Sequence, residues 1–131
     1  MNAFLVDLEN QPGAFAKVAE AIAKKGVNIT NVGGATCGDG GRAILMTADP
    51  AATRTALDSL GVTFKELEVT ESALRHEPGT LATATRRLAD AGINIEAILP
   101  TGMTGNEVTV GFVTSNPAKA REILSTVGAS R

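Results

Sequence analysis

The chain has 131 residues, a formal net charge of −2, one cysteine and no Trp or Tyr. This balance argues against a nucleic-acid surface, which needs clustered cations or exposed aromatic platforms. A single cysteine excludes an internal disulfide, the apolar runs are too short to span a bilayer, and the acidic start of the chain does not resemble a secretory signal. A cytoplasmic protein without a membrane segment is therefore expected.

The first half of the chain is predicted to be a β-α-β-β-α-β unit. Short β-prone runs predict strands at 3–8, 27–35, 42–48 and 62–67, with a turn at 36–41. The first helix follows the break at Pro12 and stops at Gly26, because apolar residues between them recur at helical spacing. The second helix spans 50–60, with Asp49 as its N-cap.

The second half repeats this order but ends after its second helix. The predicted elements are strands at 69–76, 93–99 and 107–114, helices at 79–91 and 116–127, and a turn at 101–106. Asn116 is the expected cap of the last helix, and Val127 is expected on its inner face. No fourth strand follows.

The missing strand predicts an exposed sheet edge in the second half. Unpaired backbone groups at an edge invite another strand, so we expect the other half or a second chain to cover it. The junction 62–76 contains no Gly or Pro. It could run as one long strand, or bend and serve both sheets.

The two halves also share a sequence motif, 66 residues apart. The segment NQPGAFAKVAEAIAKKGVNITNV begins at Asn10, and HEPGTLATATRRLADAGINIEAI begins at His76; seven of these 23 positions are identical. In each copy a strand leads into x-x-P-G, a helix of about twelve residues and then G-[VI]-N-I. An internal repeat of this kind indicates two equivalent structural units.

This repeated motif resembles the ACT domain, and the likeness covers nearly the whole chain. The resemblance implies an α+β protein of two ferredoxin-like βαββαβ units with antiparallel sheets, at 1–68 and 69–131, the second lacking its last strand. It also implies a regulatory, non-enzymatic protein that binds a small molecule, most often an amino acid, at interfaces between paired ACT units. A homodimer with no cofactor is expected, and the regulated protein is not identified.

The two Pro-Gly loops are the candidate ligand site. Glycine allows close approach of a ligand to the backbone, and the first N–H groups of the following helix suit a carboxylate. An asparagine at the start of the next strand offers both a donor and an acceptor, and is expected to converge with the loop. The predicted ligand contacts are Asn10, Gln11, Pro12, Gly13, Ala14, Phe15, Asn28 and Ile29 in the first half, and His76, Glu77, Pro78, Gly79, Thr80, Leu81, Asn94 and Ile95 in the second.

Plainer interpretations stay open for the same residues. The Pro-Gly pairs can be turn chemistry alone, the two asparagines can satisfy loop backbone, and His76 can be an exposed strand end. Cys37 has no neighbouring Cys or His in the sequence, so no metal or catalytic residue is predicted. The main alternative for the whole chain is a ligand-free structural or protein-interaction module, since a fold alone does not imply a function.

Overall fold

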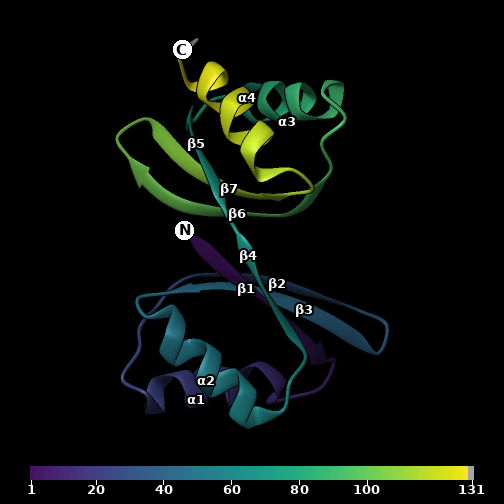
Figure 1. The fold of residues 1–131 in the computed structure, drawn as a ribbon, viewed down its shortest axis with the longest axis vertical. Helices are drawn as coiled ribbons and strands as arrows, with labels where there is room; N and C mark the ends of the chain where they lie inside the picture. The colour runs from purple at the N-terminus through teal and green to yellow at the C-terminus, as the bar shows by residue number, and fades with distance from the viewer. Residues whose placement is uncertain (130–131) are drawn as a thin grey trace. The chain divides into compact units, whose positions relative to one another are not determined.

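The computed structural model describes residues 1–129, with side chains described as far as Thr126. The chain forms two compact units (Figure 1). The first unit comprises Asn2–Leu67, and the second comprises Met1 and the chain from Glu68 onward.

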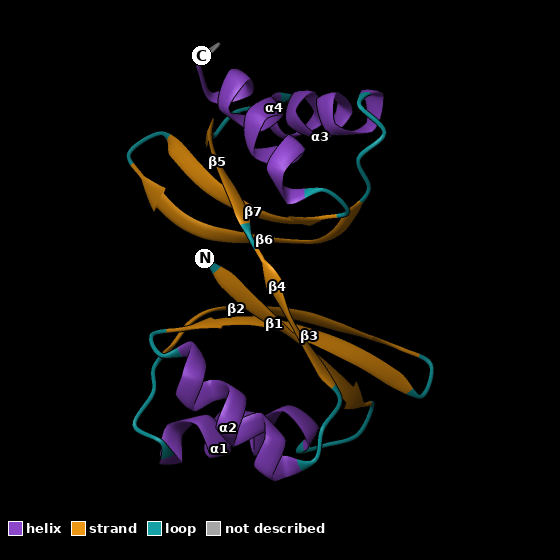
Figure 2. Cartoon of the chain, viewed as in Figure 1, coloured by secondary structure: helices purple, strands orange, loops and turns teal. Residues whose placement is uncertain are grey.

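The first unit is a four-stranded sheet covered by two helices. Its elements are β1 (Asn2–Glu9), α1 (Ala14–Lys24), β2 (Ile29–Cys37), β3 (Gly40–Thr47), α2 (Pro50–Leu60) and β4 (Phe64–Glu68). The strand order is β2-β3-β1-β4, and both helices lie on one face of the sheet (Figure 2). Alternate residues of β1 point towards the helices, so Phe4 and Val6 pack with Val18 and Ile22 of α1.

The second unit has a three-stranded antiparallel sheet, again with its helices on one face (Figure 2). Its elements are β5 (Thr70–Arg75), α3 (Thr80–Asp90), β6 (Ile95–Thr104), β7 (Glu107–Thr114) and α4 (Pro117–Ala129). Its core contains Leu74, Leu88, Phe112 and Leu124. The side chain of Val127, predicted on the inner face of the last helix, lies outside the described side chains.

The repeat is visible in the backbone hydrogen bonds as well as in the amino-acid sequence. The Asn10 N–H donates to the Asp39 carbonyl at 2.9 Å, and the His76 N–H donates to the Asn106 carbonyl at 2.8 Å. The offset is 66 residues for the donors and 67 for the acceptors. The extra residue enters at the register shift between Pro100 and Gly102 in β6, which is a β-bulge. Equivalent positions therefore differ by 66 before the bulge and by 67 after it.

The predicted turns at 36–41 and 101–106 are too long. In the structure Cys37 pairs with Gly40, which leaves a two-residue loop of Gly38 and Asp39. Gly38 has φ 64°, and Gly105 occupies the same place in the second hairpin with φ 59°. Glycine at the first loop position is typical of a type II′ turn, whose twist matches the strands. Cross-strand hydrogen bonds thus extend the strands through residues of low strand propensity.

The second unit has no counterpart of β4 among the described residues, as the sequence predicts. At the junction, β4 ends at Glu68 and β5 begins at Thr70, so one strand belongs to each sheet. Within the second unit the sheet order is β5-β7-β6, so no described strand of that unit covers the outer edge of β5. The prediction that the other half or a second chain covers this edge stays a prediction.

Candidate functional site

The Pro-Gly loop of the first unit is anchored to the β2–β3 hairpin. Besides the backbone bond described above, the Asn10 side chain donates from Nδ2 to the Gly38 carbonyl at 2.8 Å. Gln11, Pro12 and Gly13 follow, all exposed, and Ala14 begins α1. The Asn10 amide donor is therefore used within the protein, and the loop is held in place before any ligand arrives.

The equivalent loop of the second unit is held by different side chains. The Thr80 hydroxyl donates to the carbonyl of Arg75 at 2.7 Å and of Glu77 at 3.2 Å. The Arg75 guanidinium lies 3.4 Å from the Glu77 carboxylate. His76 and Pro78 are exposed. This loop thus relies on Thr80 and an ion pair where the first loop relies on the Asn10 amide.

Gly13 and Gly79 are required by backbone conformation. Gly13 has φ 88° and Gly79 has φ 94°, values that L side chains rarely adopt. A Cβ at either position would meet no atom within 4 Å. Both glycines therefore border open space, which leaves room for a ligand to approach the backbone.

The helices that follow these glycines begin without a side-chain cap. No side chain bonds to the first N–H groups of α1 or α3. In contrast, Asp49 accepts from the Ala52 N–H at 3.1 Å at α2, and Asn116 accepts from the Lys119 N–H at 3.2 Å at α4. In each unit one helix is capped by a side chain and the other is not. At the uncapped helices the Ala14 N–H donates to the Gln11 carbonyl at 3.3 Å, and the Thr80 N–H donates to the Glu77 carbonyl at 3.5 Å. The next two N–H groups of each of these helices have no partner among the described residues, and such groups suit a carboxylate.

The expected convergence of the asparagines with the loops is wrong within each unit. The carbonyl of Asn28 accepts from Ala48 at 3.0 Å, beside the Ile29–Thr47 end of the sheet, whereas the loop adjoins Gly40. Seven residues of β3 separate the two ends, about 23 Å at roughly 3.3 Å per residue. The motif runs along one helix, and a helix returns the chain to the opposite end of the sheet.

The second unit shows the same separation. The Asn94 carbonyl accepts from the Ser115 N–H at 3.0 Å, and the Asn94 N–H donates to the Ser115 hydroxyl at 3.1 Å. Ile29 and Ile95 pack against the hydrophobic cores of their units. These four residues support the strand starts, whereas the loop residues remain the candidate site.

Two surface hollows flank the first turn of α1. One, of about 410 Å³, includes Gln11 and Ala14 in its lining. The other, of about 510 Å³, lies against β2 and is mainly apolar. Its lining consists of Leu8, Phe15, Val32, Gly33, Gly34, Ala35, Thr36, Arg42 and Ala43. The loop prediction found Phe15 but missed β2, where the glycine pair in a strand was the available signal for a close approach.

In the corresponding region of the second unit the strand β6 carries larger side chains than β2 does. Leu81 stands at the Phe15 position and is 45% exposed, and Ile98 stands at the Val32 position and is 43% exposed. Pro100 pairs with Val110 where Gly34 pairs with Ala43 in the first unit. The glycine-lined hollow is therefore a feature of the first unit's sequence, and its residues are not repeated in the second.

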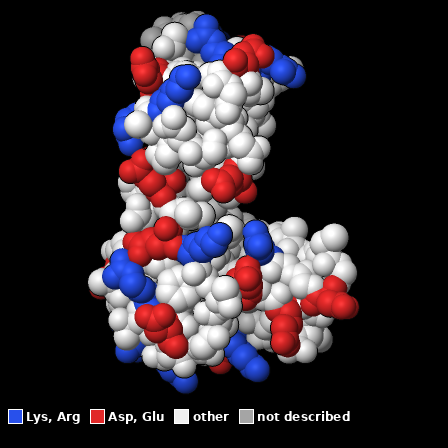
Figure 3. Space-filling model, turned by 45° about the vertical axis from the view of Figure 1, so that its right-hand side comes forward, with Lys and Arg blue, Asp and Glu red and all other residues white. Residues whose placement is uncertain are grey.

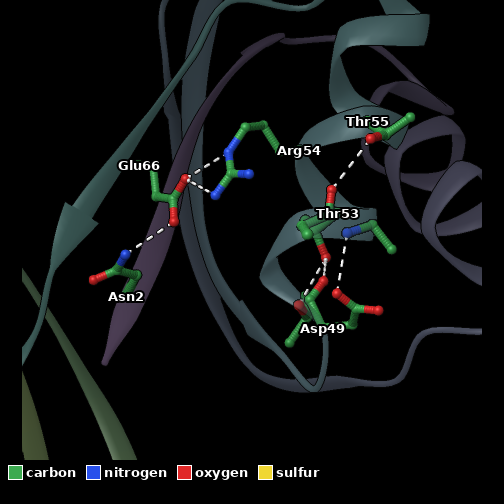
Figure 4. Close-up of polar contacts among 9 residues, drawn as sticks. Asn2, Asp49, Thr53, Arg54, Thr55 and Glu66 are labelled. Atoms are coloured by element: carbon green, nitrogen blue, oxygen red, sulfur yellow. Dashed lines mark hydrogen bonds and ion pairs between the residues drawn. The ribbon is translucent and has the colours of Figure 1, made fainter.

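The strongest ionic cluster lies away from both loops. The Glu66 carboxylate accepts from Asn2 Nδ2 at 2.9 Å and from Arg54 Nε at 2.8 Å (Figure 4). The Asn2 hydrogen bond, followed by the Arg54 hydrogen bond and charge, lowers the pKa of Glu66. Since Asn2 starts β1 and the loop follows its other end, this cluster joins β1, α2 and β4 and takes no part in the candidate site.

The remaining charges form no obvious ion site. Lys and Arg are interspersed with Asp and Glu on the face shown in Figure 3. Among the described residues, no group of three or more His, Cys, Asp or Glu is placed to hold a metal ion. No helix in the described part of the chain is long and apolar enough to cross a membrane.

Comparison with known proteins finds one matching family model and many similar folds. The family model is described as an ACT domain pair and matches residues 1–127. The crystal structure of protein BT0572 from Bacteroides thetaiotaomicron is 26% identical, with a TM-score of 0.80 over 95% of this chain and 86% of that chain. No curated protein sequence matches.

Two further structures share the fold at lower identity. The regulatory subunit of aspartate kinase from Thermus thermophilus is 21% identical, with a TM-score of 0.67 over 98% of this chain and 89% of that chain. A structure of aspartokinase alpha and beta subunits is 19% identical, with a TM-score of 0.62 over 96% of this chain and 91% of that chain. At these identities the similarity establishes the fold alone.

Proposed function

Because the chain belongs to the ACT domain pair family, we propose that it is a non-catalytic regulatory module that binds an amino acid. The site is the first turn of α1 with the apolar hollow beside β2, completed by an ACT unit of a second copy. The observation that carries this proposal is the uncapped helix start next to that hollow. The regulatory part is supported by the name of the Thermus thermophilus structure, a regulatory subunit.

An α-amino acid matches the chemistry of these groups. Its carboxylate would accept from the free N–H groups at the start of α1, where the helix dipole favours negative charge. Its apolar side chain would enter the hollow between Phe15 and Val32. The Gln11 side chain is exposed and its amide group makes no hydrogen bond among the described residues, so the amide oxygen is available to the ammonium group.

We propose the first unit as the stronger binding half. Gly33 and Gly34 leave the β2 backbone accessible, whereas the equivalent residues of the second unit are Leu99 and Pro100. The exposed His76 and Glu77 also give the second loop a different polarity. One working site per chain is therefore expected.

A thermal-shift screen against the twenty amino acids tests this proposal. A ligand that binds only the folded state raises the free energy of unfolding, by about 2.7 kcal/mol at a hundredfold excess over Kd, and so raises Tm. We expect one amino acid to raise Tm, and Gly13→Ala to remove the rise. Gly26→Ala is the matched control, because Gly26 also has a positive φ (71°) and open space but lies at the other end of α1. Gly79→Ala should keep the rise.

The outcomes separate the alternatives. Loss of the shift in Gly13→Ala and Gly26→Ala alike would contradict the loop assignment, since backbone strain alone would then explain both. Silence across the panel at millimolar concentrations would favour a ligand-free interaction module. The internal hydrogen bond of the Asn10 side chain favours that second candidate, because it shows the loop satisfying its own polar groups.

A further inference from the structure

The outer edge of β5 is unpaired in its own unit. β5 pairs with β7 along one side, and among the described residues no strand pairs with its other side. In the first unit the equivalent edge of β1 is covered, since the Asp7 N–H donates to the Thr63 carbonyl at 2.9 Å next to β4. Within its described residues, the second unit therefore has unpaired backbone groups on β5 at the place where the first unit has β4 paired with β1.

Two observations show which backbone groups project from this edge. The Val69 N–H donates to the Met1 carbonyl at 2.8 Å, so it points away from β7. Backbone groups alternate sides along a strand, which directs the N–H groups of Glu71, Ala73 and Arg75 the same way. The repeat agrees, because Ala73 is equivalent to Asp7, whose N–H points towards β4 in the first unit.

We propose that two copies of the chain pair through this edge, with β5 antiparallel to β5 of the partner subunit about a two-fold axis at Ala73. Opposed residues on paired strands share a face of the sheet. With the axis at Ala73, odd-numbered residues of one β5 face odd-numbered residues of the other, and even-numbered residues face even-numbered ones. The helix-facing side chains of both copies therefore lie on the same side of the joined sheet. Ala73 also exchanges both of its backbone hydrogen bonds with its own counterpart, as an isologous contact requires.

The charges on β5 make the edge complementary to itself. The axis at Ala73 sets Glu71 opposite Arg75 of the partner subunit, and symmetry repeats the pair. Glu71 is exposed and forms no ion pair among the described residues, and Arg75 is exposed beside Glu77. Charges of one sign along an edge repel a second copy, whereas these opposite signs attract it.

The side chains beneath the edge favour this polar partner over an apolar strand. In the first unit the edge strand β4 brings Phe64 against Phe4, with ring centroids 6.0 Å apart. At the positions of Phe4 and Val6 the second unit has Thr70 and Ser72. A strand that brings an aromatic side chain to this edge, as β4 brings Phe64, finds no aromatic partner there, and β5 itself is a polar strand.

Sedimentation velocity of the full chain over a range of concentrations, without ligand, tests the proposal. We expect a monomer–dimer equilibrium that Ala73→Pro abolishes, because proline removes the outward N–H while the bonds to β7 remain. Ala73→Val is the matched control and should keep the dimer. Circular dichroism of each variant checks that it is folded.

A charge swap tests the register. Glu71→Arg should raise the dimer Kd by about tenfold, which corresponds to about 1.4 kcal/mol. Adding Arg75→Glu to the same chain should restore the dimer. Glu96→Arg, a charge reversal on the opposite edge strand β6, should leave Kd unchanged.

Three outcomes would overturn the inference. They are a wild-type chain that stays monomeric at every concentration, a dimer that survives in folded Ala73→Pro, and a double charge swap that fails to recover the dimer lost in Glu71→Arg. A chain that stays monomeric would also leave the proposed amino-acid site without the second copy that completes it. A dimer that survives in Ala73→Pro would overturn this interface alone and leave the amino-acid site to the thermal-shift screen.

Discussion

The two units share one plan, and they differ most where β4 is present in one and absent from the other. Arg54 and Arg121 occupy equivalent places on α2 and α4. Arg54 pairs with Glu66 of β4 at 2.6 Å, whereas Arg121 pairs at 3.0 Å with Glu68, at the position that Asn2 holds in the first unit. The second unit therefore takes this carboxylate from Glu68, just before its first strand, whereas the first unit takes it from within its fourth strand.

The buried face changes in the same region. Phe4 is fully buried against Phe64 of β4, while Thr70 at the equivalent position is 6% exposed. The unit with a fourth strand therefore holds an aromatic pair at this place, and the unit without one among the described residues has a more polar edge. The two copies keep one backbone plan while their side chains differ with the number of neighbouring strands.

The largest test of this difference removes the aromatic ring. Phe4→Ala should lower the free energy of unfolding by about 3–5 kcal/mol, because it empties a fully buried site. The equivalent Thr70→Ala removes only a hydroxyl and a methyl group and should cost about 1 kcal/mol. Urea denaturation followed by circular dichroism measures both. Equal losses would show that the second unit depends on its first strand as strongly as the first unit does.

A second pair of variants should have effects of opposite sign. The hydroxyls of Thr47 and Thr53 share a hydrogen bond of 2.7 Å. At the equivalent positions the second unit has Thr114 and Ala120, and the buried Thr114 hydroxyl has no partner among the described residues. Thr47→Val should destabilise the chain by about 1 kcal/mol, and Thr114→Val should stabilise it by about 1 kcal/mol.

The same urea titration measures these two variants. A loss of stability in Thr114→Val would mean that its hydroxyl is satisfied after all, which would remove this difference between the units. The two residues end equivalent strands, so the position in the sheet is matched.

The smallest expected effect is a pH dependence that belongs to the first unit. The pKa of Glu66 is lowered from its ordinary value of 4.5, chiefly by the hydrogen bond from Asn2. A lowered folded-state pKa contributes stability above the unfolded value, and that stability is lost as pH falls through the folded-state pKa. At pH 7, Glu66→Gln should therefore lower the free energy of unfolding by less than about 1 kcal/mol, as is typical of a surface pair, and should lower Tm slightly.

The difference between wild type and Glu66→Gln should shrink as the pH falls below 4.5. Melting curves between neutral and acidic pH measure it. A difference that stays constant across this range would show that Glu66 acts through packing and not through its charge.

Most of the fold was predictable from the sequence. The apolar spacing after Pro12 predicts α1, and Asp49 and Asn116 are found as the caps that their positions predict. The missing fourth strand of the second unit was also predicted. The turns were predicted too long, because cross-strand hydrogen bonds extend β2 and β3 through glycines that local propensity assigns to a loop.

The candidate site was less predictable. The Pro-Gly pairs in the sequence indicated the two loops, whose glycines have positive φ. Asn28 was predicted to lie beside the loop, whereas the sheet places it at the opposite end. Gly33 and Gly34 were missed, because their role depends on how α1 lies across β2. Local patterns show which residues face the core, whereas the neighbours across strands are set only when the sheet forms.

The sequence by itself determined the repeat, the family likeness, the order of elements and the absent strand, because each is encoded by periodicity and by residues that act within a few positions. The tertiary structure alone decided that Asn10 bonds to the hairpin, that Arg121 pairs with Glu68, and that Asn28 lies at the opposite end of the sheet from the loop. These depend on contacts between residues distant in the chain, whose partners are chosen by strand order and register.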